Sequence, residues 1–200
     1  MNKIEMFKRH LDEKRAIKII SGIDNFDIER VRNVVSAAEM GGASAVDICY
    51  NEEIISMVRD MTSIPVFVSS VVPAELANAV KLGADAIEIG NFDAMYKKGI
   101  RVSASDVMDI LRETKKLLGN TETFISVTIP GHIDISEQIE LVRKLEVLGV
   151  DLIQTEGLKQ NTNSSNPSAH LVSYAQATIA NTLELMKHTA LPIMSASGIR

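Results

Sequence analysis

The heptapeptide Gly83-Ala-Asp-Ala-Ile-Glu-Ile89 decides the fold, because the chain carries two further copies of the same phrase. These copies are Gly42-Ala-Ser-Ala-Val-Asp-Ile48 and Gly149-Val-Asp-Leu-Ile-Gln-Thr155. Each begins with a glycine that ends an amphipathic stretch, a position where a positive φ terminates a helix. A short apolar run follows, which is typical of a buried strand. Recurring helix-to-strand junctions predict parallel strands that are joined by helices.

Composition limits the function classes. The chain has 200 residues, of which 46% are hydrophobic, and this length favours one domain over residues 1–200. The 21 Lys and Arg residues are scattered and the net charge is −5, so no nucleic-acid footprint is visible. A single cysteine, Cys49, excludes an internal disulfide, and no apolar run approaches the ~20 residues that span a membrane. We therefore expect a soluble protein with a small-molecule ligand, and leave a homo-oligomer open.

Apolar runs between turn and capping signals predict seven strands in alternation with helices. The strands are expected at 16–21, 45–49, 65–69, 86–89, 123–129, 152–155 and 192–195. The helices between them are expected near 28–40, 52–61, 75–82, 105–118, 134–148 and 169–187. An amphipathic helix is expected within 3–15, and the polar stretch 159–168 predicts a surface loop. This order of elements is that of an α/β protein.

Strict alternation permits an open doubly wound sheet or a (β/α)₈ TIM barrel. A doubly wound sheet would press Lys18 and Glu88 against helices, which is unfavourable, whereas the mouth of a barrel accommodates polar groups. We therefore predict a TIM barrel. A complete barrel takes about 250 residues, so we expect seven strands here and a missing eighth βα unit, as in a fragment or a truncated reading frame. The side chains expected inside the barrel are Lys18, Asp47, Phe67, Glu88, Ser126, Gln154 and Met194.

The active site of a barrel lies at the carboxyl ends of its strands, which selects four candidate catalytic residues. Lys18 fits a Schiff-base nucleophile, a proton-transfer base or a structural ion pair. Asp47 and Glu88 fit a general acid or base for proton abstraction beside a carbonyl, or simple partners of Lys18. His132 follows the fifth strand and fits a proton shuttle or a solvated loop residue.

The same rule selects Ser126, Gln154 and Glu156 as candidate ligand-binding residues. After the last strand, the small residues up to Ser197 and Gly198 could offer backbone N–H groups to a phosphate. A tight strand-to-helix turn explains this segment equally well. We expect no metal site, because His and carboxylate positions do not converge at ligand spacing.

The triplet Asn-Phe-Asp follows two of the predicted strands, at Asn25-Phe-Asp27 and at Asn91-Phe-Asp93. Asn and Asp at such positions commonly cap a helix, and we favour this interpretation for both triplets. Direct contact of these side chains with a ligand is the alternative.

Both triplet segments, together with Ile153-Gln-Thr-Glu-Gly157 and Ser195-Ala-Ser-Gly-Ile199, resemble the hypothetical chloroplast open reading frame 23 family of algal plastids and cyanobacteria. The resemblance covers essentially all 200 residues. It implies a barrel protein in the plastid stroma, or in the cytoplasm of a cyanobacterium. Members usually continue through an eighth strand. The family has no established reaction, so the resemblance implies no catalytic residues.

These observations lead to three functional hypotheses. The first is a phosphate-binding barrel enzyme, an isomerase, epimerase or lyase, that acts on a small phosphorylated metabolite and requires no cofactor. The second is a barrel oxidoreductase that binds flavin (FMN) at the same phosphate-binding face. The third is a non-catalytic barrel that acts as a binding or regulatory partner in the plastid.

Overall fold

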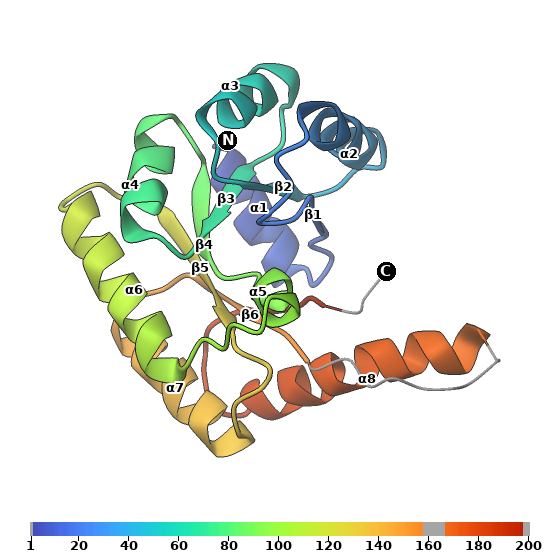
Figure 1. The fold of residues 1–200 in the computed structure, drawn as a ribbon, viewed down its shortest axis with the longest axis vertical. Coiled ribbons are helices and arrows are strands. Elements are labelled where there is room, and N and C mark those ends of the chain that lie inside the picture. Colours follow the sequence, from blue (N-terminus) through green and yellow to red (C-terminus); the bar gives the residue numbers. More distant parts are fainter. Residues whose placement is uncertain (1, 158–166, 198–200) are drawn as a thin grey trace.

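The computed structural model describes residues 2–157 and 167–197, and Figure 1 shows a curved parallel sheet surrounded by helices. Seven strands pair in sequence order, so β1 and β7 are the two edges of the described sheet. This half-barrel confirms the predicted α/β class and the barrel architecture. The strands are β1 (Lys18–Ile20), β2 (Ala45–Cys49), β3 (Val66–Ser70), β4 (Ala86–Ile89), β5 (Phe124–Ile129), β6 (Leu152–Thr155) and β7 (Ile193–Ser195).

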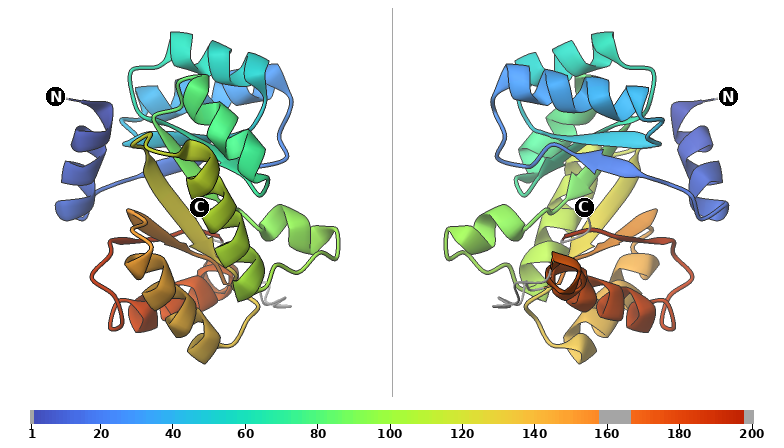
Figure 2. Two further views of the ribbon diagram at one scale, coloured as in Figure 1. Left: turned by 90° about the vertical axis from the view of Figure 1, so that its left-hand side faces the viewer. Right: turned by 90° about the vertical axis from the view of Figure 1, so that its right-hand side faces the viewer.

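The helices lie on the outside of the sheet, except that α1 and α5 lie at its two opposite ends (Figure 2). The five-residue helix α5 is not predicted from the sequence; the other helices agree with prediction within about two residues at most ends. The predicted loop at 159–168 lies largely outside the described residues. The helices are α1 (Lys3–Asp12), α2 (Ile28–Met40), α3 (Glu52–Met61), α4 (Pro73–Lys81), α5 (Asp93–Lys97), α6 (Ala104–Leu118), α7 (Ile135–Val147) and α8 (Pro167–Leu185).

The repeated phrase forms the junction that its sequence predicts. Gly42, Gly83 and Gly149 have φ angles of +73°, +90° and +69°, a region that an L side chain rarely adopts. Each glycine therefore ends a helix and turns the chain into the next strand, which is β2, β4 or β6.

The third residue of each copy has a separate structural role at the amino end of the sheet. Its side-chain oxygen accepts a hydrogen bond from the main chain where the preceding strand begins, and so satisfies a buried donor. The bonds run from Ile17 N to Ser44 Oγ (3.1 Å), from Val66 N to Asp85 Oδ2 (2.9 Å) and from Ile125 N to Asp151 Oδ2 (2.9 Å).

An apolar layer closes the amino end of the barrel interior. Phe7 of α1 is fully buried and packs edge-on against Phe67 and Phe124, with ring centroids 5.1 and 5.8 Å apart. Ala45, Ala86 and Leu152 complete this cluster. Since successive side chains of a strand alternate between faces, the next inward position of each strand lies one layer higher, toward the carboxyl ends. That layer is polar.

Candidate functional site

Lys18 lies at the centre of the polar layer, between two carboxylates on β2 and β4, two strands that β3 separates. Its Nζ lies 2.7 Å from Glu88 Oε2 on β4 and 3.4 Å from Asp47 Oδ2 on β2. All three side chains are at most 1% exposed. The ammonium also lies over the Phe67 ring of the apolar layer, 4.8 Å from its centroid. The structure therefore brings together three of the four predicted catalytic residues, which we call the Lys18 cluster.

Burial and the two carboxylates act in opposite directions on Lys18. Burial alone lowers the pKa of Lys18, but the charges of Glu88 and Asp47 outweigh it and hold the pKa above its ordinary value. For Asp47, burial and the nearby Glu88 raise the pKa, although Lys18 opposes them. Lys18 is therefore a permanent ammonium at neutral pH, which does not suit an amine nucleophile.

Asn91 connects the Lys18 cluster to the rest of the polar layer. Its Nδ2 donates to Asp47 Oδ2 at 2.9 Å and to the hydroxyl of Ser69 at 2.7 Å. The Ser69 hydroxyl in turn donates to Asp47 Oδ1. The Oδ1 of Asn91 accepts from Gln154 Nε2 at 2.9 Å. Asn91 is thus a buried hub rather than a helix cap.

Backbone geometry explains how Asn91 reaches the interior. Gly90 has a φ of +142°, and a Cβ there would lie 2.3 Å from Thr128 Cβ, so only glycine lets the backbone pass so close. Asn91 itself has a φ of +65°, a conformation that Asn tolerates better than most residues. The capping interpretation is therefore wrong for Asn91. It is correct for Asp27, which accepts a hydrogen bond from Arg30 N at the start of α2.

Thr128 provides a second connection, this time to Glu88. Its hydroxyl donates to Glu88 Oε1 at 2.6 Å and accepts from Gln154 Nε2 at 3.1 Å. Both carboxylates of the Lys18 cluster are therefore linked to Gln154 through one intervening side chain. Sequence analysis misses Asn91 and Ser69 as members of the network.

A cavity of about 670 Å³ opens at the carboxyl end of the barrel between β1 and β7. Asn91, Gln154 and Glu156 line it, together with the residues of β1. Lys18 lines it through its main chain, because the Lys18 side chain is fully enclosed, and Asp47 and Glu88 do not line it. The cavity therefore runs along β1 beside the enclosed Lys18 cluster, and Asn91, which lines the cavity and donates to Asp47, lies between the cavity and that carboxylate.

Glu156 is the carboxyl group that lines the cavity most deeply, since it is 3% exposed. Burial, together with the charge of the nearby Asp93, raises the pKa of Glu156 to about 8. Its Oε2 has no hydrogen-bond partner within 2–157 and 167–197. At neutral pH, Glu156 is therefore mostly a neutral carboxylic acid that can give up a proton.

The remaining predicted site residues lie around this centre. Ser126 is fully buried beside Glu88 in the strand register. His132 packs edge-on against Tyr96, with ring centroids 5.2 Å apart, and does not line the cavity. Burial lowers the pKa of His132, so its imidazole is neutral at pH 7.

The predicted phosphate segment lines the rim of the cavity. The Ser197 hydroxyl donates to Asp93 Oδ2 at 2.8 Å, and Ala196 N donates to Thr155 O at 3.1 Å. These two donors are therefore already used, and Gly198 lies outside the described residues. A phosphate here would depend on the main chain at Ser197, the last residue that the structure describes.

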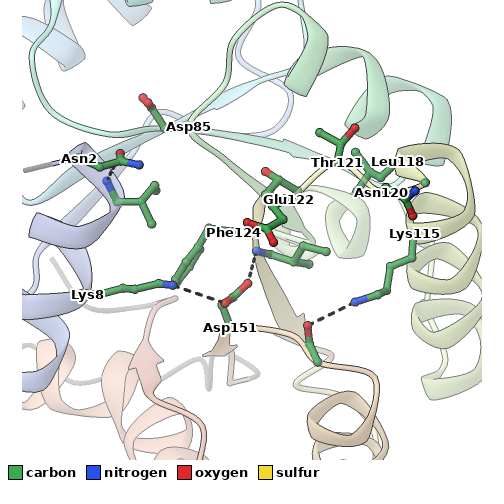
Figure 3. Close-up of a pocket in the computed structure, with 15 residues that line it drawn as sticks. Asn2, Lys8, Asp85, Lys115, Leu118, Asn120, Thr121, Glu122, Phe124 and Asp151 are labelled. Carbon is green, nitrogen blue, oxygen red and sulfur yellow. Dashed lines mark hydrogen bonds and ion pairs between the residues drawn. The ribbon is translucent and has the colours of Figure 1, made fainter.

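A second cavity, of about 580 Å³, lies at the amino end of the barrel beside α1 (Figure 3). The side chains that line it have structural partners: Asp151 accepts from Ile125 N and Lys115 donates to Leu148 O. Active sites of barrels lie at the opposite end. This cavity is therefore not a candidate active site.

Two classes of site find no support in the part of the chain that the structure describes. No group of three His, Cys, Asp or Glu side chains there could hold a metal ion. Nor does any helix described in the structure have the length and apolar character needed to cross a membrane.

Comparison with protein families matches residues 1–200 to a family described as "Protein of unknown function (DUF561)". A relative named "Uncharacterized protein ycf23" from Pyropia yezoensis is 36% identical over 187 residues, which cover 94% of this chain and 68% of the relative. A relative of the same name from Cyanophora paradoxa is 37% identical and covers 99% of this chain and 79% of the relative. The chain is thus shorter than both relatives.

Two solved structures share the fold. A protein assigned as a deoxyribose-phosphate aldolase from Toxoplasma gondii superimposes with a TM-score of 0.55 at 17% identity, over 96% of this chain and 78% of that one. A truncated 3-deoxy-D-arabino-heptulosonate 7-phosphate synthase from Thermotoga maritima gives a TM-score of 0.58 at 12% identity, over 89% and 62% of the two chains. At such identities, the likeness concerns the fold alone.

Proposed function

The chain belongs to the DUF561 family and to the hypothetical chloroplast open reading frame 23 proteins, and from that premise we propose that it is a barrel enzyme for proton transfer. The substrate is a small phosphorylated metabolite, and the reaction is of the isomerase, epimerase or lyase class. The observation that carries this proposal is the burial of three ionisable side chains, the Lys18 cluster, beside the cavity between β1 and β7. Burying such charges is unfavourable for stability alone, which favours a catalytic use.

In this proposal, Lys18 supplies a fixed positive charge. Abstraction of a proton beside a carbonyl leaves negative charge on the carbonyl oxygen, and a buried ammonium stabilises that charge strongly because water is excluded. Lys18 suits this role because Glu88 and Asp47 keep its pKa raised. A Schiff base would require the opposite shift.

Asp47 is the proposed proton acceptor. Burial raises the pKa of its carboxyl, which brings it closer to the range of an effective general base. Asn91 covers Asp47 on the cavity side, since Asn91 lines the cavity and donates to Asp47 at 2.9 Å. Substrate access to Asp47 therefore requires the Asn91 side chain to swing aside. His132 packs against Tyr96 and does not line the cavity, so we assign it no proton-shuttle role.

A phosphorylated substrate is supported by two features. The small residues Ser195, Ala196 and Ser197 line the cavity, where bulky side chains would block main-chain contact with an anion. Both solved structures that share the fold carry a phosphorylated compound in their names. The acidic groups Asp24 and Asp93 line the same cavity, and Asp93 accepts a hydrogen bond from the Ser197 hydroxyl at 2.8 Å, so a phosphate at the main chain of Ser197 lies close to a carboxylate, which opposes its binding. By its family, we place the protein in a plastid.

Hydrogen–deuterium exchange tests proton transfer without knowledge of the product. The protein is incubated in D₂O with ribose 5-phosphate or dihydroxyacetone phosphate, and loss of the proton signal beside the carbonyl is followed by NMR. We expect exchange with at least one compound, and none with Lys18→Ala. The matched control is Lys98→Ala, which removes a surface ion pair with Asp24 and retains exchange.

Two results would overturn the proposal: no exchange with either compound, or exchange at the full rate in Lys18→Ala. A yellow protein that releases flavin on denaturation would instead support the oxidoreductase hypothesis. A protein partner that co-purifies in fixed stoichiometry, without any response to metabolites, would support the binding-barrel hypothesis.

A further inference from the structure

Gln154 is oriented by the carboxylates beneath it. Asp47 accepts from Asn91 Nδ2, so Asn91 must present its Oδ1 upward to Gln154. Glu88 accepts the only proton of the Thr128 hydroxyl, so the hydroxyl can only accept from Gln154. Both contacts demand the Nε2 amide group of Gln154. The carbonyl oxygen Oε1 of Gln154 therefore takes part in neither of these two hydrogen bonds.

This oxygen has no hydrogen-bond partner among the residues that the structure describes, although Gln154 is fully buried and lines the cavity. Glu156 lies two positions further along the same strand direction, so its side chain is on the same face. Its Oε2 makes no hydrogen bond within 2–157 and 167–197, although the carboxyl group as a whole interacts with the Tyr96 hydroxyl and with the main chain of Phe92 and Asp93, and Glu156 also lines the cavity. Buried polar atoms are nearly always hydrogen-bonded, so two such atoms at one cavity wall indicate a ligand that completes them.

We propose that Gln154 and Glu156 form a hydroxyl-binding subsite, in which Gln154 Oε1 accepts a hydrogen bond from a hydroxyl group of the ligand and the Glu156 carboxyl pairs with a neighbouring hydroxyl. The ligand is thus a polyhydroxylated, sugar-like compound. This inference rests on the proposed small-molecule function, but it does not depend on a phosphate or on the reaction.

The chemistry of the two groups favours neutral hydroxyls. Because the Gln154 amide cannot flip, its Oε1 remains a hydrogen-bond acceptor and requires a donor from the ligand. A carboxylic acid donates and accepts at once, as a hydroxyl does, and burial keeps Glu156 in that neutral form at neutral pH. A ligand without hydroxyls would leave both atoms unsatisfied, which weakens binding.

A similar orphan atom elsewhere provides the control. Gln138 on α7 is 2% exposed and its Oε1 also has no partner in the described chain, but Gln138 does not line the cavity. Gln154→Met and Gln138→Met therefore remove the same chemical group from equally buried positions. Only the first should affect a ligand in the cavity.

The test is a calorimetric titration with D-ribose, D-ribose 5-phosphate and inorganic phosphate. We expect Gln154→Met to weaken binding of both sugars about tenfold or more, and to leave phosphate binding unchanged, as expected for one lost buried hydrogen bond. Gln138→Met should bind all three compounds like the unmodified protein. Glu156→Gln keeps the size of the side chain and should also weaken the binding of both sugars. This variant is used for the test if Gln154→Met does not fold.

The subsite is refuted if neither sugar binds more tightly than phosphate, or if Gln154→Met and Glu156→Gln bind the sugars undiminished. The result also separates the two proposals. Binding of ribose without any binding of phosphate would support the subsite and contradict the phosphate part of the proposed function. Binding of phosphate alone would do the reverse.

Discussion

Replacing Lys18 by Met removes the only positive charge within the buried cluster while keeping a long, unbranched side chain that is one atom shorter. Asp47 and Glu88 then face each other at at most 1% exposure without their shared cation. Breaking a buried ion pair by removing one partner costs about 3–5 kcal/mol. For a chain of this size, that corresponds to a fall in melting temperature of roughly 6–20 °C.

The loss should depend on pH, and its sign follows from Asp47. Burial and Glu88 already raise the pKa of Asp47, and Lys18 is the group that opposes them, so Lys18→Met raises it further. A carboxyl group whose pKa is raised by folding contributes stability at low pH, and loses it as pH rises through the folded pKa. The destabilisation by Lys18→Met should therefore be smallest at the lowest pH and largest at the highest pH of a titration series.

Urea unfolding at pH 5, 6, 7 and 8 measures this difference, with Lys116→Met as a control that breaks an exposed pair with Glu113. The control should change stability by less than about 1 kcal/mol at every pH. The double variant Lys18→Met/Glu88→Gln should recover part of the loss. A single variant as stable as the unmodified protein, or equally destabilised at all four pH values, would refute the description of the cluster as buried and ionised.

Three further predictions concern groups around the cluster. The unmodified protein should lose a few kcal/mol of unfolding free energy between pH 4.5 and about 8, because burial raises the pKa of Glu156 and the folded state prefers its protonated form. Glu156→Gln should not show this loss. Parallel profiles of stability against pH for the two proteins would contradict the prediction. Gly90→Ala should destabilise by more than about 2 kcal/mol in urea unfolding, since its Cβ would lie 2.3 Å from Thr128 Cβ, whereas Gly99→Ala meets no atom within 4 Å and reports backbone strain alone. Phe7→Ala should cost about 3–5 kcal/mol in the same assay and Phe26→Ala, at 59% exposure, almost nothing; similar losses for both would argue against α1 as the closure of the barrel.

The sequence predicts strand positions best where a glycine marks the junction. The bounds of β2, β4 and β6 agree with prediction at both ends, because each follows a helix-terminating glycine that sets where the strand begins. The alternation of side chains then places Lys18, Asp47 and Glu88 on one face, which the structure confirms. These three side chains can contact one another because β1 to β4 are parallel and lie next to one another in sequence order.

Asn91 shows where prediction fails. Its role depends on contact with Asp47, which is 44 residues away, and on a left-handed backbone at the end of β4. A triplet that caps a helix after β1 therefore serves a different purpose after β4, although the letters are identical. The glycine before Asn91 is the available signal, since Gly-Asn marks a turn with positive φ. Helix α5 is missed because five residues are too few for a periodic pattern.

A crystal structure of the protein with ribose 5-phosphate bound tests the central claim most directly. We predict ligand density in the cavity between β1 and β7, with a hydroxyl group within hydrogen-bond distance of Gln154 Oε1 and the phosphate beside the main chain of Ser197. Density in the amino-end cavity of Figure 3 instead, or an empty carboxyl-end cavity at saturating ligand, would contradict the assignment of the site.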